Sequence, residues 1–123
     1  MNLVDSSGWL EYFSDDKNSD FFAPAIENTP DLIVSTINLY EVFKKILQQR
    51  DETDALQAIS LMQQGTVIDI DSTISLNAAK ISYDLKLPMA DSLVLATAKM
   101  HDAVLWTQDS DLETIPSVKF IKK

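Results

Sequence analysis

Four acidic side chains stand beside apolar runs of the sequence, and their placement suggests a shared site. Asp5 and Asp109 each follow a short apolar run that predicts a strand, whereas Glu41 and Asp91 fall in the first turn of predicted helices. In open parallel sheets, ligands gather beyond the carboxyl ends of the strands. We therefore expect the four carboxylates at one edge of a sheet.

Carboxylates that crowd together without a counter-charge raise one another's pKa values and destabilise the fold. A divalent cation relieves this repulsion, and an oxygen-only ligand set without Cys or His suits Mg²⁺ or Mn²⁺. Such a site polarises a phosphoryl oxygen and lowers the pKa of a water for in-line attack. The acids therefore predict metal-dependent chemistry at phosphate that needs no histidine base.

Each of these acids also has a purely structural interpretation. Asp5 is placed to cap a helix, Glu41 and Asp91 are placed to oppose a helix dipole, and Asp109 is placed to form an Asx-turn. Asp111 lies on the same loop as Asp109 and is a rival candidate for the fourth acid. The joint placement of the acids, rather than any single one, favours a functional site.

The remaining candidate groups favour structural roles. His101 is the sole histidine and ends a predicted helix, where a cation suits the dipole. Trp9, Tyr12 and Phe13 have the spacing of a core or interface face. The acids at 15, 16 and 20 read as a solvated loop. The bases at 44, 45 and 50 share one helix and either neutralise a phosphate backbone or form a solvated face.

Short apolar runs alternate with amphipathic patterns along the chain. The runs predict strands at residues 2–4, 32–35, 66–70, 103–106 and 118–121. Helices are predicted between them, with Thr36 or Asn38 capping one that continues its period towards Gly65, and with Pro88 separating the last two. Strands that alternate with helices imply a parallel sheet covered on both faces. We expect a three-layer α/β/α fold with a mostly parallel sheet of four or five strands.

Composition narrows the class of protein further. The 123 residues fit a single domain spanning 1–123, and 46% hydrophobic content with 24% charge is typical of a globular chain. The absence of Cys excludes a disulfide scaffold and a thiol nucleophile. No run suits a membrane span or a signal peptide, so a cytoplasmic protein is expected. A net charge of −9 argues against non-specific binding of nucleic acid.

Four segments resemble, in order, the successive motifs of the PIN domain family. They are Val4-Asp5-Ser6-Ser7-Gly8-Trp9-Leu10, Ser35-Thr36-Ile37-Asn38-Leu39-Tyr40-Glu41-Val42, Leu87-Pro88-Met89-Ala90-Asp91-Ser92-Leu93-Val94-Leu95-Ala96-Thr97-Ala98 and Leu105-Trp106-Thr107-Gln108-Asp109-Ser110-Asp111. The resemblance covers nearly the whole chain at the right spacing. The short length looks most like the VapC toxins of bacterial and archaeal toxin–antitoxin pairs.

The resemblance implies a Mg²⁺- or Mn²⁺-dependent endoribonuclease that cuts structured RNA such as tRNA or ribosomal RNA. The family's acidic quartet would fall on Asp5, Glu41, Asp91 and Asp109. Asp111 would be an additional metal ligand, and the hydroxyls of Ser6 and Thr107 match positions that support the site. The family also usually forms a homodimer and is silenced by a cognate antitoxin protein whose tail blocks the active site.

Two departures and two alternatives accompany this resemblance. The family's usual Gly before the fourth strand is Asp102 here, and an aromatic residue is replaced by Leu112, so local loop geometry is in question. A phosphoacceptor receiver-like module would need paired acids after the first strand, but Asp5 is followed by Ser6 and Ser7. A PIN-like interaction module without catalysis remains an alternative.

Overall fold

Five short strands form one parallel sheet in the computed structural model, which describes residues 1–123. The strands are β1 (Asn2–Val4), β2 (Leu32–Ser35), β3 (Thr66–Ile68), β4 (Val104–Thr107) and β5 (Val118–Phe120). Their order is β3-β2-β1-β4-β5, and every neighbouring pair is parallel. The inner strands are continuous apolar runs because helices bury both faces of a parallel sheet.

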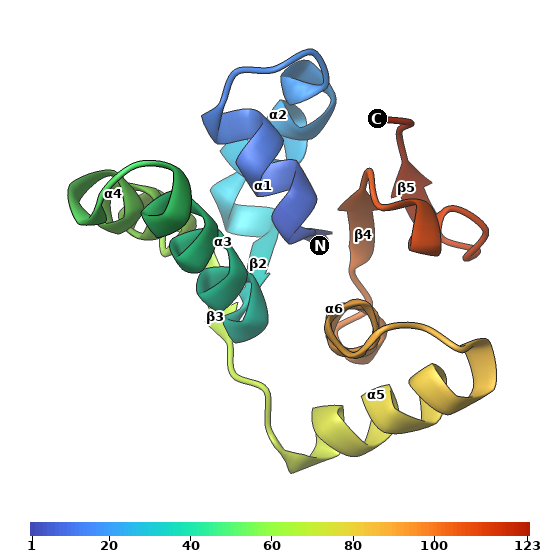
Figure 1. The fold of residues 1–123 in the computed structure, drawn as a ribbon. Helices are drawn as coiled ribbons and strands as arrows, with labels where there is room; N and C mark the ends of the chain where they lie inside the picture. Colours follow the sequence, from blue (N-terminus) through green and yellow to red (C-terminus); the bar gives the residue numbers. More distant parts are fainter.

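Six α-helices surround this sheet (Figure 1). They are α1 (Ser6–Phe13), α2 (Ser19–Glu27), α3 (Thr36–Gln49), α4 (Glu52–Met62), α5 (Ser72–Leu85) and α6 (Met89–Met100), with short 3₁₀ turns at Thr29–Asp31 and Ser110–Leu112. None of the helices is long and apolar enough to cross a membrane.

Alternate residues of the strands point into two separate cores. Val4 and Val34 pack with α1 to α4, whereas Leu3 and Ile33 pack with α6 on the other face. Helix α5 lies outside α6 and packs against it through Ile74 and Ala78, which contact Ala96. The predicted three-layer α/β/α arrangement with a parallel sheet is therefore confirmed, with five strands.

Local boundaries differ from the sequence-based expectation, most clearly at α3, α4 and β3. The cap of α3 is Ser35, neither Thr36 nor Asn38: the Ser35 hydroxyl accepts from Ile37 N–H, and Asn38 accepts from Ser35 N–H, each at 3.3 Å. The continuous helical period predicted up to Gly65 is broken because the Asp51 carboxylate caps α4. The third strand ends at Ile68 rather than residue 70.

Two residues next to the sheet depend on unusual backbone requirements: Gly8 on a close helix contact and Asp102 on a left-handed backbone conformation. At Gly8, an added Cβ would lie 2.6 Å from ring carbons of Phe22 and 2.7 Å from Val4, so α1 approaches α2 and β1 only because no side chain intervenes. Asp102, which stands where the PIN family usually has Gly, adopts the left-handed backbone with φ 52° after α6. Asp visits this region more readily than most residues, which explains how the departure is tolerated.

Candidate metal centre

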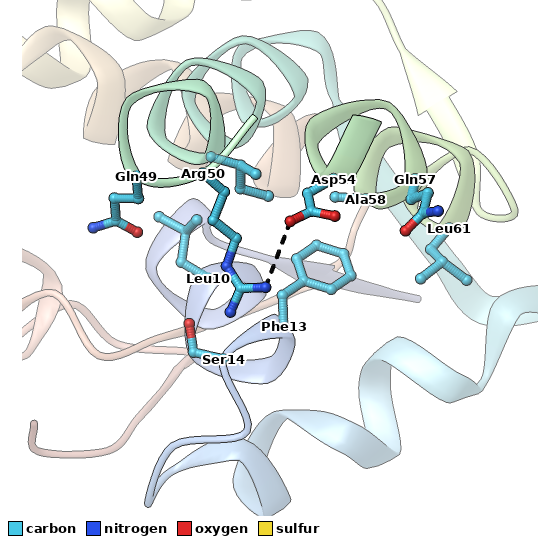
Figure 2. Close-up of a pocket in the computed structure, with 10 residues that line it drawn as sticks. Leu10, Phe13, Ser14, Gln49, Arg50, Asp54, Gln57, Ala58 and Leu61 are labelled. Atoms are coloured by element: carbon cyan, nitrogen blue, oxygen red, sulfur yellow. Dashed lines mark ion pairs between the residues drawn. The ribbon is translucent and has the colours of Figure 1, made fainter. Parts of the chain in front are cut away.

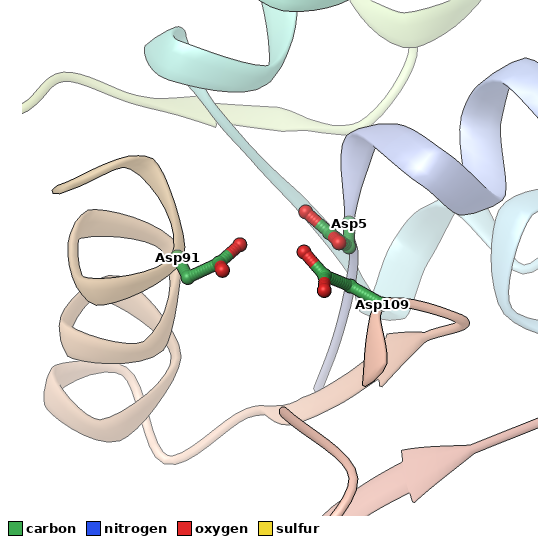
Figure 3. Close-up of side chains that lie close together, drawn as sticks. All are labelled: Asp5, Asp91 and Asp109. Carbon is green, nitrogen blue, oxygen red and sulfur yellow. The ribbon is translucent and has the colours of Figure 1, made fainter. Parts of the chain in front are cut away.

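Three of the predicted acids converge at the carboxyl edge of the sheet (Figure 3). Asp5 follows β1, Asp109 follows β4, and Asp91 lies in the first turn of α6. One carboxylate oxygen from each lies within 4.8 Å of the others. The figure shows the three side chains pointing towards a common centre.

The pairing of β1 with β4 brings two of these acids together. Val4 lies opposite Trp106, and the next amide, Asp5 N–H, donates to Trp106 C=O at 2.9 Å. The chain then turns beyond β4, where Asp109 N–H donates to the Thr107 hydroxyl at 2.9 Å. This turn directs Asp109 back towards Asp5.

Hydrogen bonds hold the Asp5 carboxylate in a fixed orientation. It accepts from Ser6 N–H at 2.8 Å, from the Thr107 hydroxyl at 2.8 Å and from the Ser7 hydroxyl at 3.2 Å. Only 5% of Asp5 is exposed. Burial raises its pKa to about 6, although the bonds from Thr107 and Ser6 oppose that rise.

Asp91 is the second strongly perturbed acid, with 8% of its surface exposed. Burial raises the pKa of Asp91 well above its ordinary value, and a side-chain hydrogen bond with Asp109 and the charges of Asp109 and Asp5 raise it further. The ion pairs of the protein join Arg50 to Asp54 and Lys80 to Asp84, so no basic side chain forms an ion pair with the cluster. An all-oxygen donor set with uncompensated negative charge fits a hard divalent cation such as Mg²⁺ or Mn²⁺.

Glu41 lies beside this cluster rather than within it. Its carboxylate accepts from the Ser6 hydroxyl at 2.8 Å, and that hydroxyl accepts in turn from the Asn38 side chain at 2.9 Å. Glu41 lines the same cleft as the three aspartates. The structure therefore connects Glu41 to Asp5 through the intervening serine.

Asp111 does not join the three converging carboxylates. Its backbone N–H donates to Asp109 Oδ1 at 3.0 Å, and its residue is exposed. Asp109 thus forms the Asx-type turn of the structural interpretation, and Asp5 caps α1, while both also face the cluster. Asp5 and Asp109 therefore have both roles: each stabilises local backbone structure, and each contributes a carboxylate to the cluster.

The acidic cluster opens into a polar cleft of about 450 Å³. Leu10 is the only apolar residue among the fourteen that line it. Asp16 and Lys45 also line this cleft, although the sequence analysis placed the first on a solvated loop and left the second undecided. His101 ends α6 at its other extremity, ten residues or about 15 Å from Asp91.

A buried amide network beside the cleft was not found from the sequence. The Gln108 side chain accepts from Asn18 at 2.9 Å and donates to Glu11 at 3.1 Å. Burial acts to raise the pKa of Glu11, but hydrogen bonds from Asn18 N–H and Gln108, with the charges of Lys123 and Lys17, bring it below its ordinary value. The one available signal was that Gln108 stands between Thr107 and Asp109 in the fourth motif.

A second, smaller pocket of about 170 Å³ lies between α1, α3 and α4 (Figure 2). Phe13, Ile46 and Leu61 contribute apolar surface to it, and the exposed Arg50–Asp54 pair at 3.6 Å borders it. Its lining shares three residues with the acidic cleft, namely Leu10, Ser14 and Gln49. The two hollows are therefore neighbours that meet along α1 and α3.

Comparisons with known proteins identify the same family as the motifs. The PIN domain family profile matches residues 3–118. A search of curated protein sequences gives no match.

Solved structures share the fold along most of the chain. A toxin–antitoxin complex from Klebsiella pneumoniae is similar with a TM-score of 0.80 and 24% identity, covering 96% of this chain and 95% of that one. VapC20 from Mycobacterium tuberculosis, described as a sarcin–ricin loop cleaving toxin, gives 0.78 and 13%, covering 94% and 95%. DNA-bound VapBC from Salmonella typhimurium gives 0.75 and 16%, covering 99% and 98%.

Proposed function

Since this chain belongs to the PIN domain family, we propose that it is a divalent-metal-dependent endoribonuclease and the toxin of a toxin–antitoxin pair. The observation that carries the proposal is the convergence of Asp5, Asp91 and Asp109 without a basic partner. The substrate we propose is structured RNA, either tRNA or ribosomal RNA. Support for RNA comes from VapC20, which is described as cleaving the sarcin–ricin loop.

In this proposal, Asp5, Asp91 and Asp109 hold the metal ion. A bound divalent cation supplies Lewis acidity, which polarises a phosphoryl oxygen and lowers the pKa of a water for attack on phosphorus. Thr107 and Ser6 N–H orient Asp5 through the hydrogen bonds described above. Glu41, held by Ser6, adds negative charge beside the three ligands. Asp111 supports the turn that aims Asp109.

Cleavage of RNA by an Asp91→Asn variant tests this assignment. The substitution keeps the side-chain volume and removes one carboxylate, so activity should fall by about two orders of magnitude or more, since metal-ion stabilisation is worth several kcal/mol. The matched control is Asp69→Asn, which changes an exposed acid just beyond β3 and should cleave like the wild type. Full activity in folded Asp91→Asn protein would exclude the assignment of Asp91. Folded wild-type protein that cuts no RNA in Mg²⁺ or Mn²⁺ would instead favour the interaction module without catalysis.

The antitoxin is proposed to cover both neighbouring hollows. Its tail would place apolar side chains in the pocket of Figure 2 and an Arg among the carboxylates, since a guanidinium pairs bidentately with carboxylate. Expression of this chain alone should arrest growth of a bacterial host, and co-expression of an adjacent small gene should relieve the arrest. Normal growth with abundant, folded wild-type protein would contradict the toxin assignment.

We also propose that residues 1–123 form a single PIN domain that acts in the cytoplasm as a homodimer. Large apolar side chains on α5 and at the start of α6 are exposed, notably Leu76, Tyr83 and Met89. No charged residue lines the hollow between these helices, and exposed apolar surface of this kind is typical of a protein–protein contact. A Tyr83→Glu variant should shift the protein from dimer to monomer in light scattering; a wild-type monomer would refute the dimer.

A further inference from the structure

An acidic protein that acts on a polyanion must attract phosphate locally. The chain carries a net charge of −9, and six carboxylate residues line the cleft around the proposed metal centre. A phosphate backbone is repelled by such a field unless basic groups lie along its path. Two basic residues line the same cleft, Lys45 and Lys123.

Neither lysine forms an ion pair with an acid of the protein, although the charge of Lys123 helps to lower the pKa of Glu11. Lys45 follows Glu41 by one helical turn on α3, a spacing that often produces an ion pair. Yet the ion pairs of the structure are Arg50–Asp54 and Lys80–Asp84, and Glu41 accepts from Ser6 instead. Both lysines are exposed and line the cleft, so they are available to a ligand that enters it.

The sheet topology places the two lysines on either side of the carboxylate cluster. Strands β1 and β4, which lead to Asp5 and Asp109, are neighbours in the order β3-β2-β1-β4-β5, with β2 on one side of them and β5 on the other. Helix α3, with Lys45, follows β2 on one side, and Lys123 follows β5 on the other. A strand of nucleic acid that crosses the carboxyl edge of the sheet passes a lysine, the acids and the second lysine.

The chain fixes both positions with buried contacts. Lys45 is carried by α3, whose start is locked by the mutual hydrogen bonds of Ser35 and Asn38. The segment before Lys123 is held by Asn18, whose side chain donates to Lys122 C=O at 3.1 Å and to Gln108 at 2.9 Å. Because Asn18 and Gln108 are buried, this network sets where the end of the segment lies.

We propose that Lys45 and Lys123 bind the backbone phosphates that flank the scissile position of the substrate strand. The proposal rests on the proposed nuclease function and names the residues that let an acidic chain take a nucleic acid. Phosphate contacts position a strand without reading its sequence. The two lysines therefore set the affinity for the strand and its position along the cleft, whereas the base sequence of the substrate is recognised by other residues.

The salt dependence of binding tests this proposal without knowledge of the natural target. The probe is a labelled single-stranded RNA of mixed sequence, bound to the full chain in chelator so that it is not cut. Each phosphate contact in a single strand adds about 0.7 to the slope of log affinity against log salt concentration. Lys45→Gln and Lys123→Gln should each lower the slope by about 0.7, and the double variant by about 1.4.

Lys44→Gln is the matched control, since it makes the same charge change one residue away on α3. Lys44 does not line the cleft, and its ammonium group lies 5.7 Å from the centre of the Tyr40 ring. The slope of this variant should equal that of the wild type. Under cleavage conditions, the two cleft variants should raise KM about 2- to 5-fold, the range for an exposed charge pair, with kcat nearly unchanged.

The outcomes separate this proposal from the nuclease assignment. If wild type cleaves RNA and all three variants share its salt slope, the lysine proposal is wrong and the nuclease stands. If wild type binds RNA without cutting it, and only the cleft variants lose slope, the two lysines bind backbone phosphate and the nuclease assignment is wrong. Wild-type protein that neither binds nor cuts RNA overturns both.

Discussion

The Asp5 carboxylate accepts three hydrogen bonds and also faces two other acids. The hydrogen bonds hold it in place, while the carboxylates of Asp91 and Asp109 repel it when they are ionised. The hydrogen bonds from Ser6, Ser7 and Thr107 orient its oxygens, and the turn of Asp109 directs a second carboxylate towards the same centre. Anchoring of this kind lets repelling groups remain together in the absence of a cation, because the side chains have few other rotamers.

The raised pKa values of Asp5 and Asp91 predict how stability depends on pH in chelator. The folded chain binds protons on these acids more tightly than the unfolded chain does. The free energy of unfolding should therefore fall as pH rises from about 4, the ordinary Asp value, through about 6 for Asp5, and further for Asp91.

Asp91→Asn isolates this effect, since Asn does not ionise. The Tm of the variant minus that of wild type should grow as pH rises through this window, and Asp69→Asn should show no such trend. Thermal melts in chelator at several pH values measure it. A difference that stays constant with pH would show that Asp91 is not destabilised when ionised in the fold.

At the scale of elements, the contact of α1 with α2 depends on a missing side chain. Gly8→Ala would place a Cβ against Phe22 and Val4, both fully buried. Overpacking costs about 1–3 kcal/mol, and the gain in helix propensity returns about 1 kcal/mol. Urea denaturation should therefore show a net loss of stability of up to about 2 kcal/mol.

A smaller neighbour should relieve that clash. Phe22→Leu combined with Gly8→Ala should lose less stability than the sum of the two single variants, because the residues touch. If the stability losses of the two single variants simply add in the double variant, α1 shifts away from α2 as a unit and the contact of residue 8 with Phe22 does not cause the loss.

The connection from α6 to β4 contains a residue under backbone strain. Asp102 has φ 52°, a conformation that costs an L-residue about 1–2 kcal/mol and costs Gly much less, although Gly also loses more entropy on folding. Asp102→Gly should stabilise the protein by about 0.5–1 kcal/mol in urea denaturation.

The control for this variant is Ser14→Gly. Ser14 is the exposed C-terminal cap of α1, but it has an ordinary φ of −85°. Glycine relieves no strain there and should destabilise the fold. Equal effects at the two positions would show that the backbone at Asp102 is not the cause.

At the scale of the whole molecule, the cluster couples ligand binding to folding. Mg²⁺ or Mn²⁺ at about ten times its dissociation constant should add roughly 1.4 kcal/mol by mass action on the folded state. For a chain of this length, that corresponds to a Tm rise of about 3–8 °C. Asp91→Asn should gain less, because one of the three carboxylates is gone.

Matched ionic strength is the necessary comparison, since screening stabilises any chain of net charge −9. NaCl should reproduce only part of the shift. Coinciding melting curves in Mg²⁺, Mn²⁺ and NaCl would argue that Asp5, Asp91 and Asp109 do not form one cation site.

The sequence by itself determined the alternation of strands and helices, because strands buried on both faces must be continuous apolar runs. The same rule located Asp5 and Asp109 after β1 and β4, and Pro88 with the following apolar period located Asp91. The resemblance of four ordered motifs to PIN domains indicated the family, which the profile match confirmed.

Only the tertiary structure decided which polar groups meet. Asn18 and Gln108 lie 90 residues apart in the chain, and no periodicity relates them before β1 pairs with β4. The direction of Asp109 rather than Asp111 towards the cluster depends on the turn held by the Thr107 hydroxyl. Side-chain direction in a loop follows from hydrogen bonds to distant elements, whereas strand and helix patterns follow from neighbours along the chain.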